Sequence, residues 1–266
     1  MIVPDERATP AAPVSFGRGP IRLVTFDLYD TLIELDPPRW VRLQAAAEKV
    51  GVATDLDALR AADRVAEDFY TAENGTWPIR DRTGDEREAF RLAHLRRWLD
   101  AAGIAAGEDE ISGLRRAYVD EFAADATGGN YRVFAEVIPT LDRLRDAGVM
   151  RAVISNADVD VTELCTHFAF AGHMDAIITS ALVGWEKPDP RTFYAALDHP
   201  MIDVAPGDAL HVGDQPGSDV SGALAVGMRA ALIDRYDRHD DGEHPAVRVR
   251  SLSDLADLVI AHNRQV

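Results

Sequence analysis

RLVTFDLYDTLI, residues 22–33, is the stretch around which the rest of the chain is organised. Its apolar run, residues 23–26, predicts a short buried strand, because buried parallel strands are near-continuous hydrophobic runs. The run stops at Asp27, and Asp30 and Thr31 follow within four positions. Open α/β sheets bind ligands at the carboxyl ends of their strands. A single aspartate after one strand more often caps a turn, so a functional interpretation of Asp27 depends on similar signals downstream.

Composition limits the classes of function. The chain has 266 residues, of which 47% are hydrophobic and 27% charged, typical of a globular protein with one large or two smaller domains. Its net charge of −17 repels nucleic acids and anionic membranes, so we expect neither as a partner. The single cysteine, Cys165, excludes an intrachain disulfide and fits a cytoplasmic location, which we therefore expect. No apolar stretch reaches membrane-spanning length.

The N-terminal third predicts a tail and a helical insert. Residues 1–20 hold four prolines and carry charges where a secretory signal would need an apolar centre, so we expect a flexible tail. Residues 36–127 lack strand patterns. Apolar residues at three-and-four spacing predict helices over 39–50, 56–70, 85–102 and 109–124, with a turn at 74–78. We expect these helices to form a small domain inserted after the first strand.

Residues 128–266 alternate between strands and helices. Strands are predicted at 151–154, 176–179, 209–212 and 229–233, and helices at 138–147, 159–168, 190–197, 218–226 and 252–262. Such alternation predicts an α/β fold with a parallel sheet and helices on both faces. Residues 21–35 and 128–266 would form this core domain, with all strands ending at one edge because crossovers are right-handed.

Polar side chains collect at that predicted edge. Asp27, Ser155 and Asp214 each follow a predicted strand, and Lys187 lies in a loop after another. Buried charges are costly unless they are paired or bound to metal. Asp219 would begin the next helix, where it serves either as an acid favoured by the helix dipole or as a second metal ligand. Two or three carboxylates supply the hard oxygen ligands that Mg²⁺ prefers.

Four motifs in this order resemble those of the haloacid dehalogenase (HAD) superfamily of hydrolases. They are FDLYDTL (26–32), VISN (153–156), GWEKPDPRTF (184–193) and HVGDQPGSDVSGALAVGM (211–228). Together the motifs are specific, although each alone is weak. The resemblance implies a HAD-like Rossmannoid core. The helical insert stands where subfamily I members carry their C1 cap.

The resemblance also implies roles for individual residues. Asp27 would be the nucleophile that forms an aspartyl-phosphate, with Thr31 orienting it. Ser155, Asn156 and Lys187 would bind the phosphoryl group. The Mg²⁺ ligands would be Asp27, the main-chain carbonyl of Tyr29, Asp214 and Asp219. Phosphoryl transfer requires mainly positioning and charge neutralisation, which these residue types provide.

Tyr29 departs from the phosphatase pattern. Phosphatases of the superfamily have a second aspartate two residues after the nucleophile, as general acid and base, and here that position is a tyrosine. The 2-haloacid dehalogenases of the superfamily share the tyrosine, which makes dehalogenation through Asp27 the leading alternative. Those enzymes use no metal and lack the Gly-Asp pair found here at 213–214. A third alternative is a weakly catalytic, phosphate-binding interaction protein.

Our prediction is a Mg²⁺-dependent phosphatase acting on a small phosphorylated metabolite. Specificity would reside in the helical insert, where Trp77 and Arg80 of the predicted turn are candidate substrate contacts. A solvated loop with one packed tryptophan is the simpler interpretation of that turn. The sequence defines neither the metabolite nor an oligomeric state.

Overall fold

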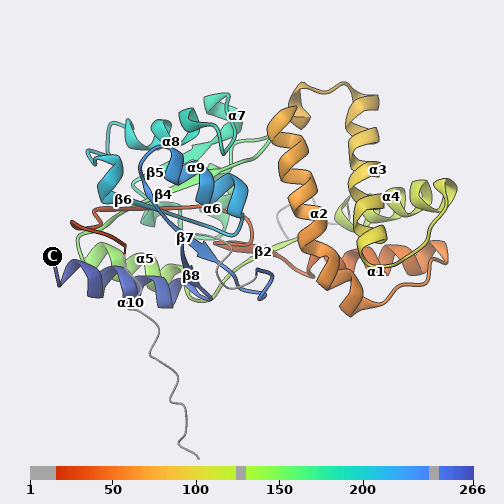
Figure 1. The fold of residues 1–266 in the computed structure, drawn as a ribbon, viewed down its shortest axis with the longest axis horizontal. Coiled ribbons are helices and arrows are strands. Elements are labelled where there is room, and N and C mark those ends of the chain that lie inside the picture. The colour runs from red at the N-terminus through yellow and green to blue at the C-terminus, as the bar shows by residue number, and fades with distance from the viewer. Residues whose placement is uncertain (1–15, 124–129, 240–245) are drawn as a thin grey trace, which may run out of the picture.

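A six-stranded, all-parallel sheet forms the centre of the molecule (Figure 1). The computed structural model describes residues 16–123, 130–239 and 246–266. In spatial order the strands are β5 (Ala176–Thr179), β4 (Met150–Ser155), β1 (Leu23–Phe26), β6 (Ala209–Gly213), β7 (Arg229–Ile233) and β8 (Val247–Val249). The predicted α/β class with a parallel sheet is confirmed. β1 lies at the centre, so Asp27 leaves the sheet from its middle.

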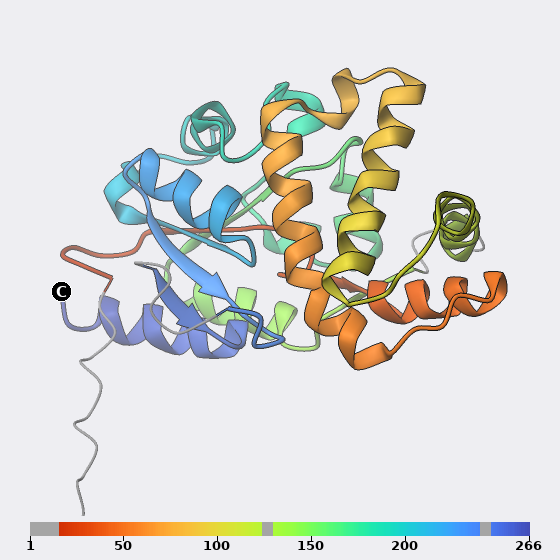
Figure 2. The ribbon, with the colours of Figure 1, turned by 45° about the vertical axis from the view of Figure 1, so that its right-hand side comes forward.

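Helices cover both faces of this sheet (Figures 1 and 2). On one face, α5 (Val137–Asp146), α6 (Thr162–His167) and α10 (Leu252–Asn263) bury their apolar sides against Val24 and Phe26. On the other, α8 (Pro190–Leu197) and α9 (Gly222–Ala225) pack on Leu23, with the short α7 (Ser180–Val183) at the end of β5. Alternate β1 residues therefore enter opposite hydrophobic clusters, as expected for a strand covered on both sides.

The predicted insert is a separate group of four helices with its own hydrophobic cluster. They are α1 (Arg39–Val50), α2 (Leu56–Thr76), α3 (Gly84–Ala101) and α4 (Glu108–Ala123), at the right of Figure 1. The Asp55 side chain caps α2 by accepting the Ala58 N–H, and Thr83 forms a capping box with Glu86 at the start of α3. Trp98 lies in the centre of the cluster and donates its indole N–H to the Leu59 carbonyl.

Two short strands that we did not predict join the insert to the sheet domain. β2 (Ile33–Leu35) pairs antiparallel with β3 (Tyr131–Val133), and Arg132 donates to Glu34 at 2.6 Å across the pair. Both chain connections of the insert therefore run side by side. Three-residue strands are too short for a reliable period-two signal, which explains why the sequence did not reveal them.

Several predicted boundaries were wrong. The turn at 74–78 begins later, because α2 continues through Asn74 and Gly75; buried Asn74 donates to Glu186 and accepts the Ile79 N–H at 2.6 Å. The segment 218–226 is a π-helical turn, Pro216–Ser221, followed by α9. Phe16, inside the predicted tail, is buried in the core, so the fold begins before residue 21. Residues 1–15 lie outside the described residues, as do 128 and 129 at the predicted return to the core.

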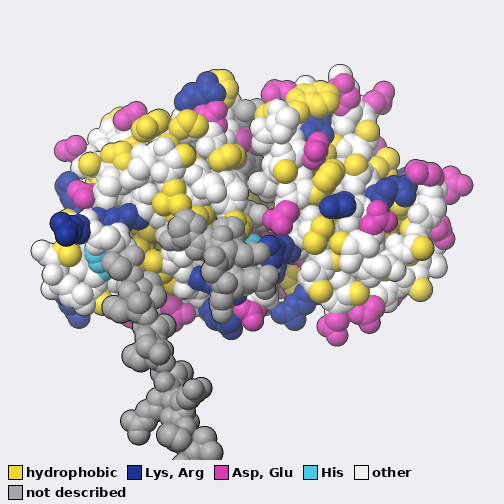
Figure 3. Space-filling view, in the orientation of Figure 1, with side chains coloured by type: hydrophobic (Ala, Val, Ile, Leu, Met, Phe, Trp, Pro, Cys, Tyr) yellow, Lys and Arg dark blue, Asp and Glu magenta, His cyan; other side chains and the backbone are white. Residues whose placement is uncertain are grey.

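Short 3₁₀ turns at Ile79–Asp81, Ala171–His173 and Pro206–Asp208 complete the fold. Acidic side chains are spread over both the sheet domain and the insert on the face shown in Figure 3. Within the described ranges, no helix combines the length and apolar character that crossing a bilayer requires.

Candidate active site

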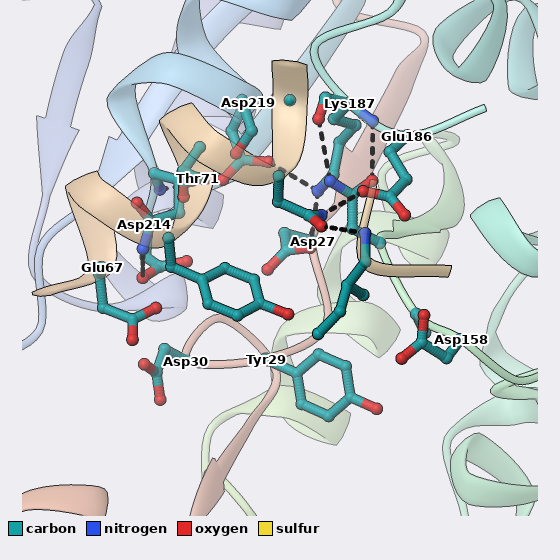
Figure 4. A pocket seen from close by; sticks show the side chains of 18 of the residues that line it. Asp27, Tyr29, Asp30, Glu67, Thr71, Asp158, Glu186, Lys187, Asp214 and Asp219 are labelled. Atoms are coloured by element: carbon teal, nitrogen blue, oxygen red, sulfur yellow. Dashed lines mark hydrogen bonds and ion pairs between the residues drawn. The ribbon is translucent and has the colours of Figure 1, made fainter. Parts of the chain in front are cut away.

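The carboxyl edge of the sheet brings together the polar residues that follow β1, β4 and β6 (Figure 4). Asp27 follows β1 directly, and its N–H donates to the Val212 carbonyl of β6 at 2.8 Å. Ser155 is the last residue of β4, and Asp214 follows β6. Parallel strands end at the same edge, so Asp27 and Asp214 line one cavity although nearly 190 positions separate them, whereas Ser155 is fully buried and does not line it.

Lys187 links two of the carboxylates. Its Nζ lies 2.6 Å from Asp27 Oδ1 and 2.6 Å from Asp219 Oδ1, and its side chain is 2% exposed. Burial alone would lower the pKa of Lys187, but Asp219 and Asp27 raise it, so the ammonium stays charged. Burial raises the pKa of Asp27 to about 6, while Lys187 acts in the opposite direction. A charged lysine is therefore held against the predicted nucleophile.

Asp219 is fixed by three donors. Its Oδ1 accepts from Lys187 and lies 3.2 Å from His211 Nε2, and its Oδ2 accepts the Gln215 N–H at 2.9 Å. Burial disfavours the carboxylate, but Lys187 and His211 outweigh it and lower the pKa of Asp219. A Cβ at Gly213 would lie 2.2 Å from the Asp219 carboxyl carbon, so only glycine permits this close approach.

The site contains a set of oxygens that fits a Mg²⁺ ion. Carboxylate oxygens of Asp27, Asp214 and Asp219 all lie within 4.8 Å of one another. Burial raises the pKa of Asp214 well above its ordinary value although Arg238 lowers it, and a bound cation would favour the charged form of this carboxylate. Hard carboxylate oxygens, crowded and buried, are the donors that Mg²⁺ prefers. These three residues could hold the ion.

Asn156 and Ser155, predicted to bind phosphate, and Thr31, predicted to orient Asp27, differ in their hydrogen bonding. Asn156 holds the Lys187 backbone, donating from Nδ2 to its carbonyl at 2.9 Å and accepting its N–H on Oδ1 at 2.7 Å. The hydroxyls of Ser155 and Thr31 are buried and have no hydrogen-bond partner among the described residues. The predicted contact between Thr31 and Asp27 is therefore not formed as a hydrogen bond in this structure.

Tyr29 lines the cavity next to Asp27. Its ring packs against Tyr131 of β3, with ring centroids 5.4 Å apart. Burial raises the pKa of the Tyr29 phenol, and Tyr131 and Asp27 raise it further. The phenol is therefore a weaker acid here than in water.

The helical insert completes a cavity of about 230 Å³ above Asp27. The lining residues from the insert belong to α1, α2 and the turn after α2. The sequence analysis did not identify them as candidate site residues. They are Arg39, Glu67, Tyr70, Thr71, Asn74, Gly75 and Ile79. Trp77 does not line this cavity and is 43% exposed. The side chain of Arg80 lies outside the described part of the structure. The simpler interpretation of Trp77, as a residue of the turn, fits better than a substrate contact.

Arg238 was missed, because the charged segment 234–241 resembles a solvated loop. Its side chain is 9% exposed, and its Nη2 lies 2.9 Å from Asp214 Oδ2. Arg238 is therefore buried and paired, although the composition of its segment is that of a solvated loop. Acidic and basic residues alternate in this segment, and nothing in that pattern indicates that one arginine points inward.

Glu67 is an ionisable group of the insert with a shifted pKa. Burial raises the pKa of Glu67 from 4.5 to about 6, with Arg39 opposing and Asp63 and Asp30 reinforcing the shift. Arg39 Nη1 lies 3.3 Å and His94 Nε2 3.8 Å from its Oε1. Burial lowers the pKa of His94 to about 4, so this imidazole is neutral at pH 7.

We expect Glu67→Gln to change how stability depends on pH. The raised pKa means that the folded state binds the proton more tightly than the unfolded state, so folding stability falls as pH rises from about 4.5 to 6. As pH rises across this window, the free energy of unfolding of the wild type should fall relative to that of the variant by up to about 2 kcal/mol, because one pKa unit corresponds to about 1.4 kcal/mol. Denaturant unfolding at several pH values measures it. Glu108→Gln, at a side chain 89% exposed, is the control, and a pH-independent difference for Glu67→Gln would contradict the expectation.

Comparison with known proteins agrees with this geometry. Residues 21–227 match the family model of haloacid dehalogenase-like hydrolases. The chain is 30% identical over 220 residues to haloacid dehalogenase-like hydrolase domain-containing protein 3 of Bos taurus, covering 80% of this chain and 82% of that protein. It is 30% identical over 253 residues to a phosphoserine phosphatase of Thermus thermophilus, covering 88% and 98% respectively.

A solved structure has the same fold. It is the putative HAD-hydrolase YfnB of Bacillus subtilis, described as bound to magnesium and as revealing interdomain movement; it aligns with a TM-score of 0.62 at 16% identity, over 91% of this chain and 99% of that one. The family match covers both the parallel sheet and the helical insert. The chain therefore belongs to the haloacid dehalogenase-like hydrolases.

Proposed function

We propose that the protein is a Mg²⁺-dependent phosphatase that hydrolyses a small phosphorylated metabolite through an aspartyl-phosphate on Asp27. One observation carries the proposal: a buried lysine touches Asp27 at 2.6 Å within a cluster of three carboxylates. An anionic carboxylate can approach an anionic phosphate only where positive charge offsets the repulsion. Lys187 provides part of that charge, and Mg²⁺, when bound, would supply Lewis-acid neutralisation.

The proposed reaction has two steps. A carboxylate oxygen of Asp27 attacks phosphorus, the bond from phosphorus to the ester oxygen breaks, and the leaving oxygen takes up a proton. Water then attacks the same phosphorus, and the bond to Asp27 breaks, which releases phosphate. Ser155, Asn156 and Lys187 would hold the phosphoryl group, and Thr31 would orient Asp27. The buried, unpartnered Ser155 hydroxyl supports its role, because buried hydroxyls normally have a partner and a phosphoryl oxygen would provide one.

Two further observations support the substrate class. The Thermus thermophilus relative, which the chain matches over nearly its whole length, is a phosphatase of a small phosphorylated amino acid by its name. The cavity of about 230 Å³, to which the insert contributes part of the lining, fits a small substrate better than a macromolecule. A screen of phosphate esters with and without Mg²⁺ tests the proposal. Mg²⁺-dependent phosphate release from at least one small ester is expected, and no release from any ester would contradict it.

Tyr29 predicts a strong dependence on the leaving group. A phenol, with a reference pKa of about 10, is a poor general acid near neutral pH, and general acid catalysis is typically worth about 10² to 10⁴ in rate. Burial of Tyr29 weakens the acid further. We expect aryl and acyl phosphates, which leave without help, to react far faster than sugar or alkyl phosphates. Tyr29→Asp should narrow this gap by accelerating the poor leaving groups.

The measurement is log kcat/KM against leaving-group pKa for the wild type and Tyr29→Asp. Tyr29→Phe is the matched control, since it removes only the hydroxyl and should leave the slope unchanged. A flat line for the wild type would mean that another acid protonates the leaving oxygen. Glu67, in the same cavity with a pKa of about 6, would then be the first group to replace.

Dehalogenation is the second candidate activity, because of Tyr29. A tyrosine two residues after the nucleophile is the pattern of the 2-haloacid dehalogenases that the sequence resembles. The oxygen cluster around Asp214 favours phosphatase activity, because those dehalogenases use no metal. A weakly catalytic phosphate-binding protein would instead bind phosphate without turnover of any ester.

A further inference from the structure

Arg238 connects the sheet domain to the helical insert through one side chain. It lies in the loop after β7, and the two terminal nitrogens of its guanidinium contact different domains. Nη2 lies 2.9 Å from Asp214 Oδ2, at the candidate metal site, and Nη1 lies 3.0 Å from Asp63 Oδ2, on α2 of the insert. The planar fork of arginine suits it to hold two carboxylates at once.

The loop that carries Arg238 is itself fixed. Asp234, at the end of β7, accepts the Arg238 N–H at 2.8 Å and the His239 N–H at 3.0 Å. Arg248 of β8 donates to the same carboxylate at 2.7 Å. From the insert, Arg64 donates to the Arg238 carbonyl at 3.2 Å. Contacts from both domains therefore fix the loop that carries the Arg238 guanidinium. Asp214 is paired with an arginine whose own position is fixed.

Asp63 is a fully buried carboxylate on a helix of the insert, 0% exposed. Arg39 Nε donates to its Oδ1 at 2.6 Å, and Arg238 donates to its Oδ2. Asp30 joins the network through Arg39 Nη2 at 2.8 Å and lies 3.9 Å from Arg238 Nη1. Replacing buried ion pairs by apolar residues is often neutral for stability, so stability alone does not account for this network.

The contact with Arg238 orients Asp214. Arg238 and the Gln215 side chain both donate to Oδ2 of Asp214, at 2.9 and 3.2 Å. Among the described residues, none donates a hydrogen bond to the other oxygen, Oδ1. One carboxylate oxygen is thus used for positioning, and the other stays available to a cation. Removing a residue that hydrogen-bonds to a metal ligand and orients it commonly weakens metal binding by about 10- to 100-fold.

We propose that Arg238 is a positioning residue that holds Asp214 ready for Mg²⁺ and, through Asp63, couples this orientation to closure of the helical insert. The inference rests on the proposed function only in assuming that Mg²⁺ binds at Asp214. Movement of the insert away from the sheet domain would break the contact between Arg238 and Asp63. The guanidinium would then lose its partner on the insert. By linkage, Mg²⁺ binding must then favour the closed arrangement to the same extent that closure favours Mg²⁺.

Isothermal titration with Mg²⁺ of the full chain tests the coupling. We expect Arg238→Gln to weaken Mg²⁺ binding by about 10- to 100-fold, and Asp63→Asn to weaken it by a smaller factor. In the Arg238→Gln background, Asp63→Asn should have no further effect, because Asp63 acts through Arg238. Arg96→Gln is the matched control, since it removes an arginine–glutamate pair on the outside of the insert, and should bind Mg²⁺ as the wild type does.

Amide hydrogen exchange supplies a second readout that does not involve turnover. Adding Mg²⁺ should slow exchange in α2 of the wild type and of Arg96→Gln, but not in Arg238→Gln or Asp63→Asn. Unchanged or tighter Mg²⁺ binding by Arg238→Gln would overturn the proposal, and so would an Asp63→Asn effect that persists without Arg238. Circular dichroism spectra and unfolding midpoints confirm that the variants compared are folded.

The outcomes separate this inference from the proposed function. A wild type that binds Mg²⁺ with the expected coupling but releases phosphate from no ester would contradict the phosphatase and leave the role of Arg238 standing. A Mg²⁺-dependent phosphatase whose Arg238→Gln variant binds Mg²⁺ normally would contradict only the role of Arg238.

Discussion

Replacing Asp27 by asparagine is expected to abolish turnover while leaving the protein folded. The amide is not a usable nucleophile, and removal of a catalytic nucleophile lowers kcat by roughly 10⁴-fold or more. Lys187 would keep Asp219 as its partner at 2.6 Å, so the variant does not leave a buried ammonium unpaired. Phosphate release under saturating substrate measures the effect, and the circular dichroism spectrum checks the fold.

Asp158→Asn is a matched control for this variant. Asp158 lines the same cavity but is exposed and does not belong to the oxygen cluster. The control should retain most of the activity. If Asp27→Asn kept more than a trace of activity, Asp27 would not be the nucleophile. Trapping of a phosphorylated wild-type chain that is absent from the variant would strengthen the assignment.

Replacing the candidate metal ligand Asp214 should lower activity nearly as much as replacing Asp27. We expect Asp214→Asn to lower kcat/KM by roughly 10³-fold, because metal neutralisation of phosphoryl charge is worth several kcal/mol. Chelation of Mg²⁺ by EDTA should reduce the wild type to a similar level, and added Mg²⁺ should restore the wild type but not the variant. Full wild-type activity in EDTA would contradict the metal assignment and favour dehalogenation.

The sheet and the main groups of the site could be predicted because their signals are local. An apolar run followed by a polar residue marks the end of a buried strand, and parallel topology brings such ends together. Asp27 and Asp214 follow from this argument alone. Topology also places Lys187 at this edge, but its direct contact with Asp27 required the family resemblance, because a lysine in a loop has no fixed direction in the sequence.

Other features depend on contacts between distant segments. The turn signal at Asn74 and Gly75 was overridden because Asn74 is held by Glu186, more than a hundred residues away. Arg238 lies in a charged segment whose composition is typical of a solvated loop, and its inward direction is set by ion pairs with Asp63 and Asp214. No residue pattern within the loop encodes these partners, so the link between the insert and the candidate metal site could not be predicted.

We propose that this hydrolase cleaves phosphate esters and not carbon–halogen bonds. The most direct measurement is parallel release of phosphate from p-nitrophenyl phosphate and of chloride from 2-chloropropionate, each with Mg²⁺ and with EDTA. We predict phosphate release that requires Mg²⁺ and no chloride release above background. Chloride release that is unaffected by EDTA, with no release of phosphate, would contradict phosphatase activity and favour dehalogenation.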